Sequence, residues 1–259
     1  MKEYLLVALV VFCFCSCQTT DEQFQQQLVV SSFLKSRHET TDLKLNYAEQ
    51  IGEKLDETGL GVSGANVLFK HGNEKCRLNE EKPGLYIYRG VQFTANETCY
   101  LEIKIDTFFI TSRTVIPDTL KLLGTYPDTI TIYDNINLSW FPSKYHSGYL
   151  VSIKNLEDPD KREAIDEDYE EFTREGRSDV QSYLIDKNVT KFNLTSIEFM
   201  WYGKHRISVK AIDRNYFDFM RSAEEQSNIE PICHINGCLG VFGSYSEDSI
   251  YLYLKKEEK

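Results

Sequence analysis

The side chains with the clearest chemical potential are seven cysteines, and three of them lie near the N-terminus. Cys13 and Cys15 fall in or beside an apolar run, residues 5–14, that follows one lysine. Such a run is too short to span a bilayer as a permanent helix, and it indicates an export signal. The pair Ser16-Cys17 after it is similar to a bacterial lipobox, so we expect cleavage before Cys17 and acylation of its thiol. An ordinary cleaved signal peptide is the alternative.

The mature chain keeps four further cysteines, and an even number in an exported protein favours disulfide bonds. Two fall in each half, so the economical pairs are Cys76 with Cys99 and Cys233 with Cys238, although the sequence leaves the connectivity open. A zinc site at Cys233-x4-Cys238 beside His234 is a weaker interpretation, because the sequence has no second cysteine pair at finger-like spacing.

The histidines and hydroxyl groups show no catalytic spacing. No two histidines stand at i and i+4, and there is no HExxH motif, so we expect no metal site. Gly243-Ser244 lacks the flanking pattern of a serine nucleophile, and no Gly-Lys-Ser/Thr follows the glycines at 237–243. We therefore expect no catalytic residue, no cofactor and no enzymatic activity. The histidines are His38, His71, His146, His205 and His234.

Aromatic side chains offer the best binding potential in the sequence, which holds 16 tyrosines and 15 phenylalanines. Several stand near predicted turns, where exposed rings often mark contacts with sugars or proteins. The alternative is that most of them belong to the core. The candidates for ligand contact are Trp201, Tyr202, Tyr216, Phe217 and Tyr245.

Charge and length limit the possible partners. The 259 residues carry a formal net charge of -11, which argues against nucleic acid, because nucleic-acid binding needs a basic face. The same charge disfavours direct attraction to anionic lipid, so membrane attachment is expected through acyl chains. About 240 residues remain after the leader, enough for one large or two ordinary domains.

Short strands separated by turns follow the leader. Cys99–Ile105 alternates with period two, and residues 28–34 and 108–116 read as strands, as expected for an all-β chain of β-sandwiches. Residues 117–130 hold two prolines and a glycine and mark a junction. The expected organisation is a signal peptide at 1–16, a lipidated tether at 17–27, a first sandwich at 28–117, a linker at 118–130, and a second sandwich at 131–259 that ends in a glycine-rich loop and a strand.

The second half has the pattern of a fibronectin type III domain. Trp140 lies in an early strand, Tyr149–Ile153 alternates behind it, and Val209–Asp213 belongs to a late strand. His205 stands where an aromatic residue is usual, which puts the tyrosine corner of such domains in doubt. An acidic insertion at 157–175 holds ten acidic and three basic side chains. We interpret it as a solvated insertion; a calcium loop is the alternative, but the glycine and terminal glutamate of an EF-hand are missing.

Four short motifs follow one another along the mature chain: Val62–Val67, Gly84-Leu85-Tyr86, Thr114–Pro117 and Asn236–Ser244. Their order and spacing resemble a Bacteroidota lipoprotein family described as domain of unknown function 4249, in which a glycine is more typical at the position of Cys238. The resemblance implies an outer-membrane lipoprotein, often encoded near TonB-dependent receptors, whose N-terminal sandwich is immunoglobulin-like or carboxypeptidase-regulatory-like. It implies no catalytic residue.

We therefore expect a non-enzymatic, lipid-anchored protein of the outer membrane that faces the cell surface. Its expected partner is a TonB-dependent receptor or another envelope protein. A surface module that captures glycans or peptides is the alternative. Aromatic rings gathered on one open face would favour capture, and a flat, rimmed apolar patch would favour docking.

Overall fold

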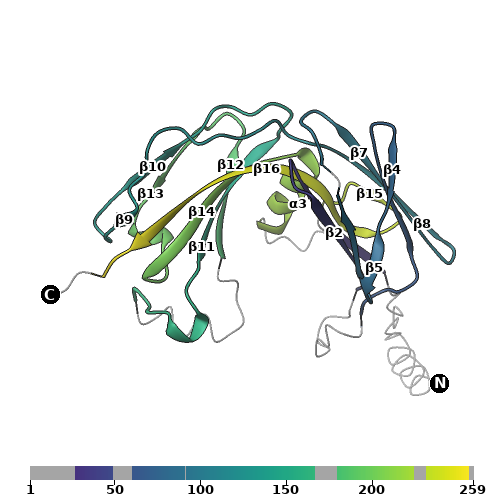
Figure 1. Cartoon of the computed structure of the whole chain (residues 1–259), viewed down its shortest axis with the longest axis horizontal. Helices are drawn as coiled ribbons and strands as arrows, with labels where there is room; N and C mark the ends of the chain where they lie inside the picture. The colour runs from purple at the N-terminus through teal and green to yellow at the C-terminus, as the bar shows by residue number, and fades with distance from the viewer. Residues whose placement is uncertain (1–26, 49–59, 91, 167–179, 225–231, 257–259) are drawn as a thin grey trace, which may run out of the picture.

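The computed structural model describes residues 27–48, 60–90, 92–166, 180–224 and 232–256. Strands dominate these ranges, and a single α-helix among them, α3 (Arg214–Glu224), lies between two groups of strands (Figure 1). The predicted all-β fold with two sandwiches is confirmed. Residues 1–26, with the predicted signal peptide, Cys17 and nearly all of the tether, lie outside the described residues.

The N-terminal sandwich packs two antiparallel layers against each other. Period-two burial along the strands drives this packing, because alternate side chains of a strand face the same layer; β1, for example, buries every second residue. One layer contains β1 (Leu28–Lys35), β2 (Thr40–Tyr47), β6 (Leu85–Arg89) and β5 (Asn79–Lys82). The other has the order β15 (Ile235–Asn236), β8 (Phe108–Val115), β7 (Thr98–Ile105), β3 (Asn66–His71) and β4 (Glu74–Arg77).

The C-terminal sandwich is built around the buried indole of Trp140, which is 1% exposed and packs edge-on against Tyr149. Two short 3-10 turns, Pro159–Lys161 and Ser196–Glu198, lie in its connections. Its large layer contains β12 (Val180–Asp186), β11 (Gly148–Asn155) and β14 (Gly203–Ile212). The short strand β9 (Thr129–Ile130) pairs with the last strand of the chain, which belongs to the same layer. The small layer is β10 (Ile136–Ser139) and β13 (Lys191–Leu194).

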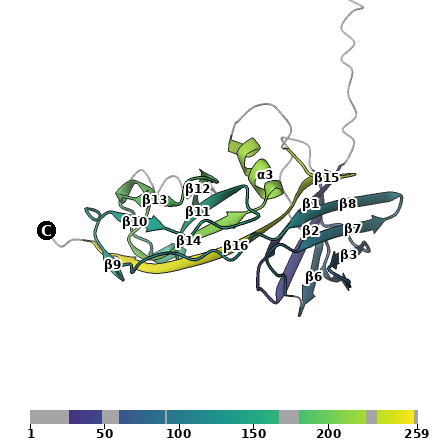
Figure 2. The same cartoon turned by 90° about the horizontal axis from the view of Figure 1, so that it is seen from above.

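One strand belongs to both sandwiches. β16 (Leu239–Leu254) pairs in parallel with β1 over its first half and antiparallel with β14 over its second half. The change occurs at Tyr245, which lies opposite Lys35 on one side and Ile212 on the other. The layer of the N-terminal sandwich that contains β1 and the large layer of the C-terminal sandwich thereby form one continuous nine-stranded sheet. β16 is the long yellow strand that spans Figures 1 and 2.

The start of β16 corrects the expectation of a glycine-rich loop there. The strand already begins at Leu239, and Gly240 has a φ of +109° with the position of a Cβ only 1.9 Å from the Val30 carbonyl oxygen. A glycine is therefore needed for close approach of the two backbones, not for a loop. Residues 235–245 pair with strands of the N-terminal sandwich, whereas the expected division placed all of 131–259 in the second one.

Part of the acidic insertion is described. Residues 157–166 include the turn at Pro159–Lys161, and Ala164 forms an isolated bridge with Trp201. Residues 167–175, including Asp168 and Glu170 of the calcium alternative, lie outside the described residues.

His205 occupies the position where the sequence departs from the fibronectin pattern. Its ring is 1% exposed, with Nδ1 3.0 Å from the Gly203 carbonyl oxygen and Nε2 3.2 Å from Nδ2 of Asn155. A neutral ring satisfies both partners, because Nδ1–H donates to the carbonyl while Nε2 accepts from the amide. Burial lowers the pKa of His205 to about 4.

We expect His205 to make folding sensitive to mild acid. The unfolded chain binds a proton near pH 6.5 and the folded chain only near pH 4, so stability falls as the pH is lowered through that window. The loss approaches about 3 kcal/mol. Urea unfolding should show that the free energy of unfolding falls more between pH 7.5 and pH 4.5 in the wild type than in His205→Gln. Equal differences would contradict the assignment.

The shared strand should couple the stability of the two sandwiches. Phe242 is fully buried in the N-terminal core against Phe69, while both tryptophans lie in the C-terminal half. Phe242→Ala should cost about 3–5 kcal/mol. We expect the midpoint of urea unfolding, measured by tryptophan fluorescence, to move to a lower urea concentration, although the mutation lies outside the half that contains the tryptophans.

The control is Tyr133→Ala, because this side chain is 74% exposed and its removal should change the free energy of unfolding by less than about 0.5 kcal/mol. An unchanged tryptophan transition in Phe242→Ala would show that the halves unfold independently.

Candidate functional site

A cleft of about 790 Å³ lies where the two sandwiches, α3 and the segment before β15 meet. β8 supplies one wall, the connection before β11 supplies a second, and the start of α3 supplies the third. The volume falls in the range of about 300–1,000 Å³ that is usual for ligand pockets. The lining side chains with polar or aromatic groups include Tyr100, Arg113, Tyr145, His146, Arg214, Asn215 and His234.

A buried carboxylate at the base of the cleft joins its walls. Asp213 directly precedes α3, and its Oδ1 accepts from the backbone N–H of Tyr216, as in a helix N-cap, and from that of Ser244. Its Oδ2 accepts from the Thr114 hydroxyl on β8 at 2.6 Å. Burial raises the pKa of Asp213, and these hydrogen bonds act in the opposite direction. Because its oxygens are occupied by the fold, Asp213 serves the architecture of the cleft.

Asn215 ties the same helix end to two strands. Its Nδ2 donates to the Arg113 carbonyl oxygen at 2.7 Å and to the Phe242 carbonyl oxygen at 2.8 Å. The first strand belongs to the N-terminal sandwich and the second is the shared strand. The wall formed by α3 is therefore held to the sheets by side-chain hydrogen bonds as well as by packing.

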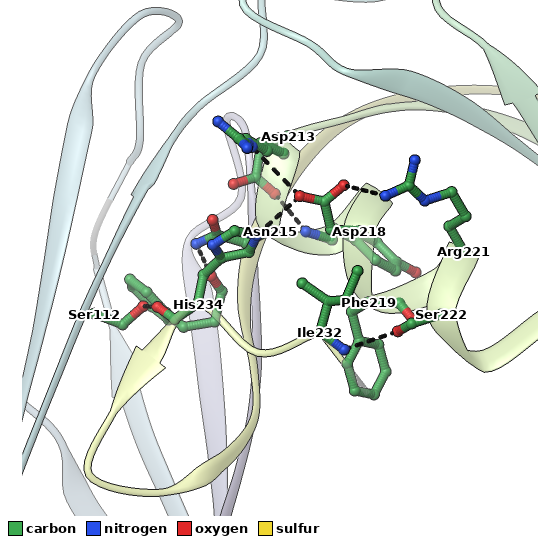
Figure 3. A network of polar contacts seen from close by, with 12 residues as sticks. Ser112, Asp213, Asn215, Asp218, Phe219, Arg221, Ser222, Ile232 and His234 are labelled. Atoms are coloured by element: carbon green, nitrogen blue, oxygen red, sulfur yellow. Dashed lines mark hydrogen bonds and ion pairs between the residues drawn. The ribbon is translucent and has the colours of Figure 1, made fainter. Parts of the chain in front are cut away.

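Three basic side chains converge on one carboxylate beside the cleft, and two of the three, Arg214 and His234, line the cleft. Figure 3 shows Asp218 with His234 and Arg221. Asp218 is 2.9 Å from Nε2 of His234, 3.3 Å from Nε of Arg214 and 3.6 Å from a guanidinium nitrogen of Arg221. One negative charge cannot neutralise two arginines, so this cluster keeps a net positive charge even with a neutral imidazole. It stands out in a chain whose formal net charge is -11.

Other side chains that line the cleft add positive charge and aromatic surface. Arg113 is exposed on β8, at the end of which the cleft lies. His146 packs against Tyr149, and burial lowers its pKa, so it contributes a neutral ring. Guanidinium groups beside aromatic faces suit carboxylate-bearing ligands, because the planar fork binds carboxylates in a bidentate manner.

The aromatic side chains predicted to contact ligand lie elsewhere. Trp201 and Tyr216 are buried, and Tyr202 is half-buried against the C-terminal core. Tyr216, Phe217 and Tyr245 come together under α3, in a cluster with Phe33. The rings that line the cleft are Tyr100 and Tyr145, which are 46% and 51% exposed.

The sequence contained a signal for only one of these two rings. Tyr100 follows Cys99 in an alternating strand, so its side chain faces away from the core. Tyr145, Arg113, Arg214 and His234 carry no motif, and their convergence depends on how the sandwiches meet.

Neither expected disulfide is present among the described cysteines. Cys76, Cys99 and Cys238 are free thiols. Cys76 is on β4 and Cys99 on β7, with β3 between them, so their Cα atoms are separated by two strand spacings of about 4.8 Å each. A disulfide needs Cα atoms about 4.4–6.8 Å apart. Cys233 instead accepts a hydrogen bond from the Gly240 backbone N–H.

Within the described ranges we find no helix whose length and hydropathy would suit it to crossing a bilayer.

No curated protein matches the sequence. Among solved structures, a two-domain fibronectin type III segment of chicken tenascin matches with 11% identity and a TM-score of 0.25, covering 88% of this chain and 99% of that one. The FN1–FN3 domains of chicken CNTN1 match with 13% identity and a TM-score of 0.26, covering 88% and 66%. The profile described as "Domain of unknown function (DUF4249)" matches residues 17–250, and the chain belongs to this family.

Proposed function

We propose that this chain is a non-enzymatic, lipid-anchored protein of the outer membrane that docks with a TonB-dependent receptor or another envelope protein. The cleft between the sandwiches is the proposed contact site, and an acidic segment of the partner is the proposed occupant. The observation that carries this proposal is the surplus of guanidinium groups around Asp218. The charge of this cluster is positive, whereas the net charge of the chain is negative. Complementary charge fixes the register of a complex and accelerates its formation.

A binding role suits the cleft better than catalysis. Its buried carboxylate, Asp213, is hydrogen-bonded by three donors, and its half-buried histidine, His146, rests on Tyr149. Proton transfer needs a titratable group within reach of the reacting atom and not held by other partners. His234, which also lines the cleft, is paired with Asp218. The guanidinium groups of Arg113 and Arg214 are donors, and donors select and orient a ligand.

A second candidate is capture of an acidic glycan or peptide for uptake. Tyr100 and Tyr145 favour it, because both rings are about half-exposed and line the same cleft as Arg113 and Arg214. Aromatic faces beside guanidinium groups can bind a free ligand as well as a protein segment.

Affinity purification of the tagged, lipidated chain from gently solubilised outer membrane separates the two candidates. We expect stoichiometric recovery of a TonB-dependent receptor or another envelope protein. Arg214→Glu should weaken this association about tenfold or more, because a like charge then faces the acidic segment. Arg214 is 78% exposed at the first position of α3, where the helix dipole favours glutamate. The like charge of Asp218 one turn away should cost only about 0.2–0.5 kcal/mol, so the fold should be kept.

The charge-matched control is Lys154→Glu on β11, an exposed lysine that does not line the cleft. It should leave recovery unchanged. Recovery of the lipoprotein alone would overturn stable docking and make screens of acidic glycans and peptides the next experiment.

The anchor is tested separately by metabolic labelling with a clickable palmitate analogue. The chain should incorporate the label, and Cys17→Ala should remove it, because the lipobox directs acylation to this thiol. Cys15→Ala is the matched control and should keep the label. Labelling that survives Cys17→Ala would contradict the lipoprotein assignment.

A further inference from the structure

We propose that His71, Glu74 and Cys76 form a binding site for a divalent transition-metal ion of the zinc type on the N-terminal sandwich. The three residues belong to the β3–β4 hairpin, at the right of Figure 1, and they line or adjoin a hollow different from the cleft. The site is independent of the proposed docking function.

The strand register brings the three side chains to one face. His71 lies directly opposite Glu74 across the turn at Gly72-Asn73, and directly opposed residues of an antiparallel pair share a face. Cys76 stands two residues beyond Glu74 and therefore points to the same side. His71 and Cys76 are buried, while Glu74 at the hairpin end is exposed.

The distances match those between ligands of one ion. Nε2 of His71 is 3.5 Å from Sγ of Cys76 and 3.5 Å from Oε2 of Glu74. The three donor atoms all lie within 4.8 Å of one another. Tetrahedral zinc, with bonds of about 2.0–2.2 Å to N and O and about 2.3 Å to S, separates its ligand atoms by about 3.3–3.6 Å.

A carboxylate behind the histidine orients the ring for this role. Oε1 of Glu97 is 2.8 Å from Nδ1 of His71, and Oε2 of Glu97 accepts from the Thr94 backbone N–H and hydroxyl group. A ring that donates from Nδ1 to a carboxylate presents the lone pair of Nε2 toward Cys76 and Glu74. This carboxylate–histidine arrangement recurs behind metal-binding histidines, where it fixes the tautomer and raises the basicity of the ligand.

The donor set selects the class of metal. A thiolate and an imidazole favour zinc and its transition-metal neighbours over calcium and magnesium, which prefer oxygen ligands. Three protein ligands leave one position of a tetrahedral ion. His71 and Glu74 line an open hollow of about 720 Å³, together with Glu39, Gln92 and Thr94, from which a fourth ligand could enter. Water or a side chain of a partner would complete the coordination.

Cobalt(II) titration of the purified, metal-free, full-length chain tests this site. We expect one equivalent to bind with thiolate-to-cobalt charge-transfer absorption, and zinc to displace it. Cys76→Ser should abolish the absorption, and Glu97→Gln should weaken affinity about 10–100-fold. Cys238→Ala, which removes a thiol outside the donor set, is the matched control and should keep the full signal.

Glu74→Gln keeps the test decisive if a buried variant fails to fold, because this side chain is 76% exposed. It should keep the melting temperature of the metal-free wild type and lower cobalt affinity at least tenfold. Absence of the charge-transfer band in folded wild type, or its survival in Cys76→Ser, would overturn the proposal. So would alkylation of Cys76 that is rapid and unchanged by zinc, which would instead indicate a thiol activated by His71 and Glu97.

Discussion

The double pairing of β16 is the constraint on which the rest of this structure depends. A sheet edge exposes unpaired N–H and C=O groups, and two separate sandwiches would each leave such an edge. Here the first half of one strand pairs with β1 and the second half with β14. The backbone hydrogen bonds of both sandwiches therefore run through the same sixteen residues. A change in the relative position of the sandwiches would have to bend or break this strand.

That constraint explains why the two sandwiches can form a cleft between them without moving about a hinge. The walls come from β8, from the start of α3 and from the connection before β11, which are far apart in the chain. Asp213, Thr114 and Ser244 join the start of α3, β8 and β16 through buried hydrogen bonds. Buried and satisfied polar networks specify one arrangement, because any shift would leave a desolvated group without its partner. The basic side chains beside the cleft are thus held on a rigid frame.

The distribution of charge is the basis of the selectivity that we propose for this frame. The acidic side chains of the described part of the insertion, residues 157–166, do not line the cleft, whereas Arg113 and Arg214 do, and Arg221 lies near Asp218. An acidic protein with a small basic site repels most polyanions at long range but accepts a carboxylate at short range. The hairpin with His71, Glu74 and Cys76 lies on the N-terminal sandwich, so the two proposed binding sites use different surfaces.

Local features of this protein could be predicted from its sequence, and long-range pairings could not. Period-two burial in β1 and β7, the buried Trp140 and the turn after His71 depend on residues close together in the chain, so the sequence carried clear signals for them. The motifs that resemble the family are also local signals, and the family match over residues 17–250 confirms them. The return of residues 235–245 to the N-terminal sandwich was missed, because its glycines are typical of a loop and the backbone approach that requires Gly240 comes from a strand about 210 residues earlier. The cysteine pairs were predicted because two cysteines fall in each half of the chain, whereas the order of β4, β3 and β7 keeps Cys76 and Cys99 two strands apart.

The sequence by itself determined which residues face a core, because side-chain periodicity is a local property of a strand. Only the tertiary structure decided which distant strands pair, and with them where Tyr100, Arg113, Arg214 and His234 meet, because that choice depends on the complementarity of whole surfaces.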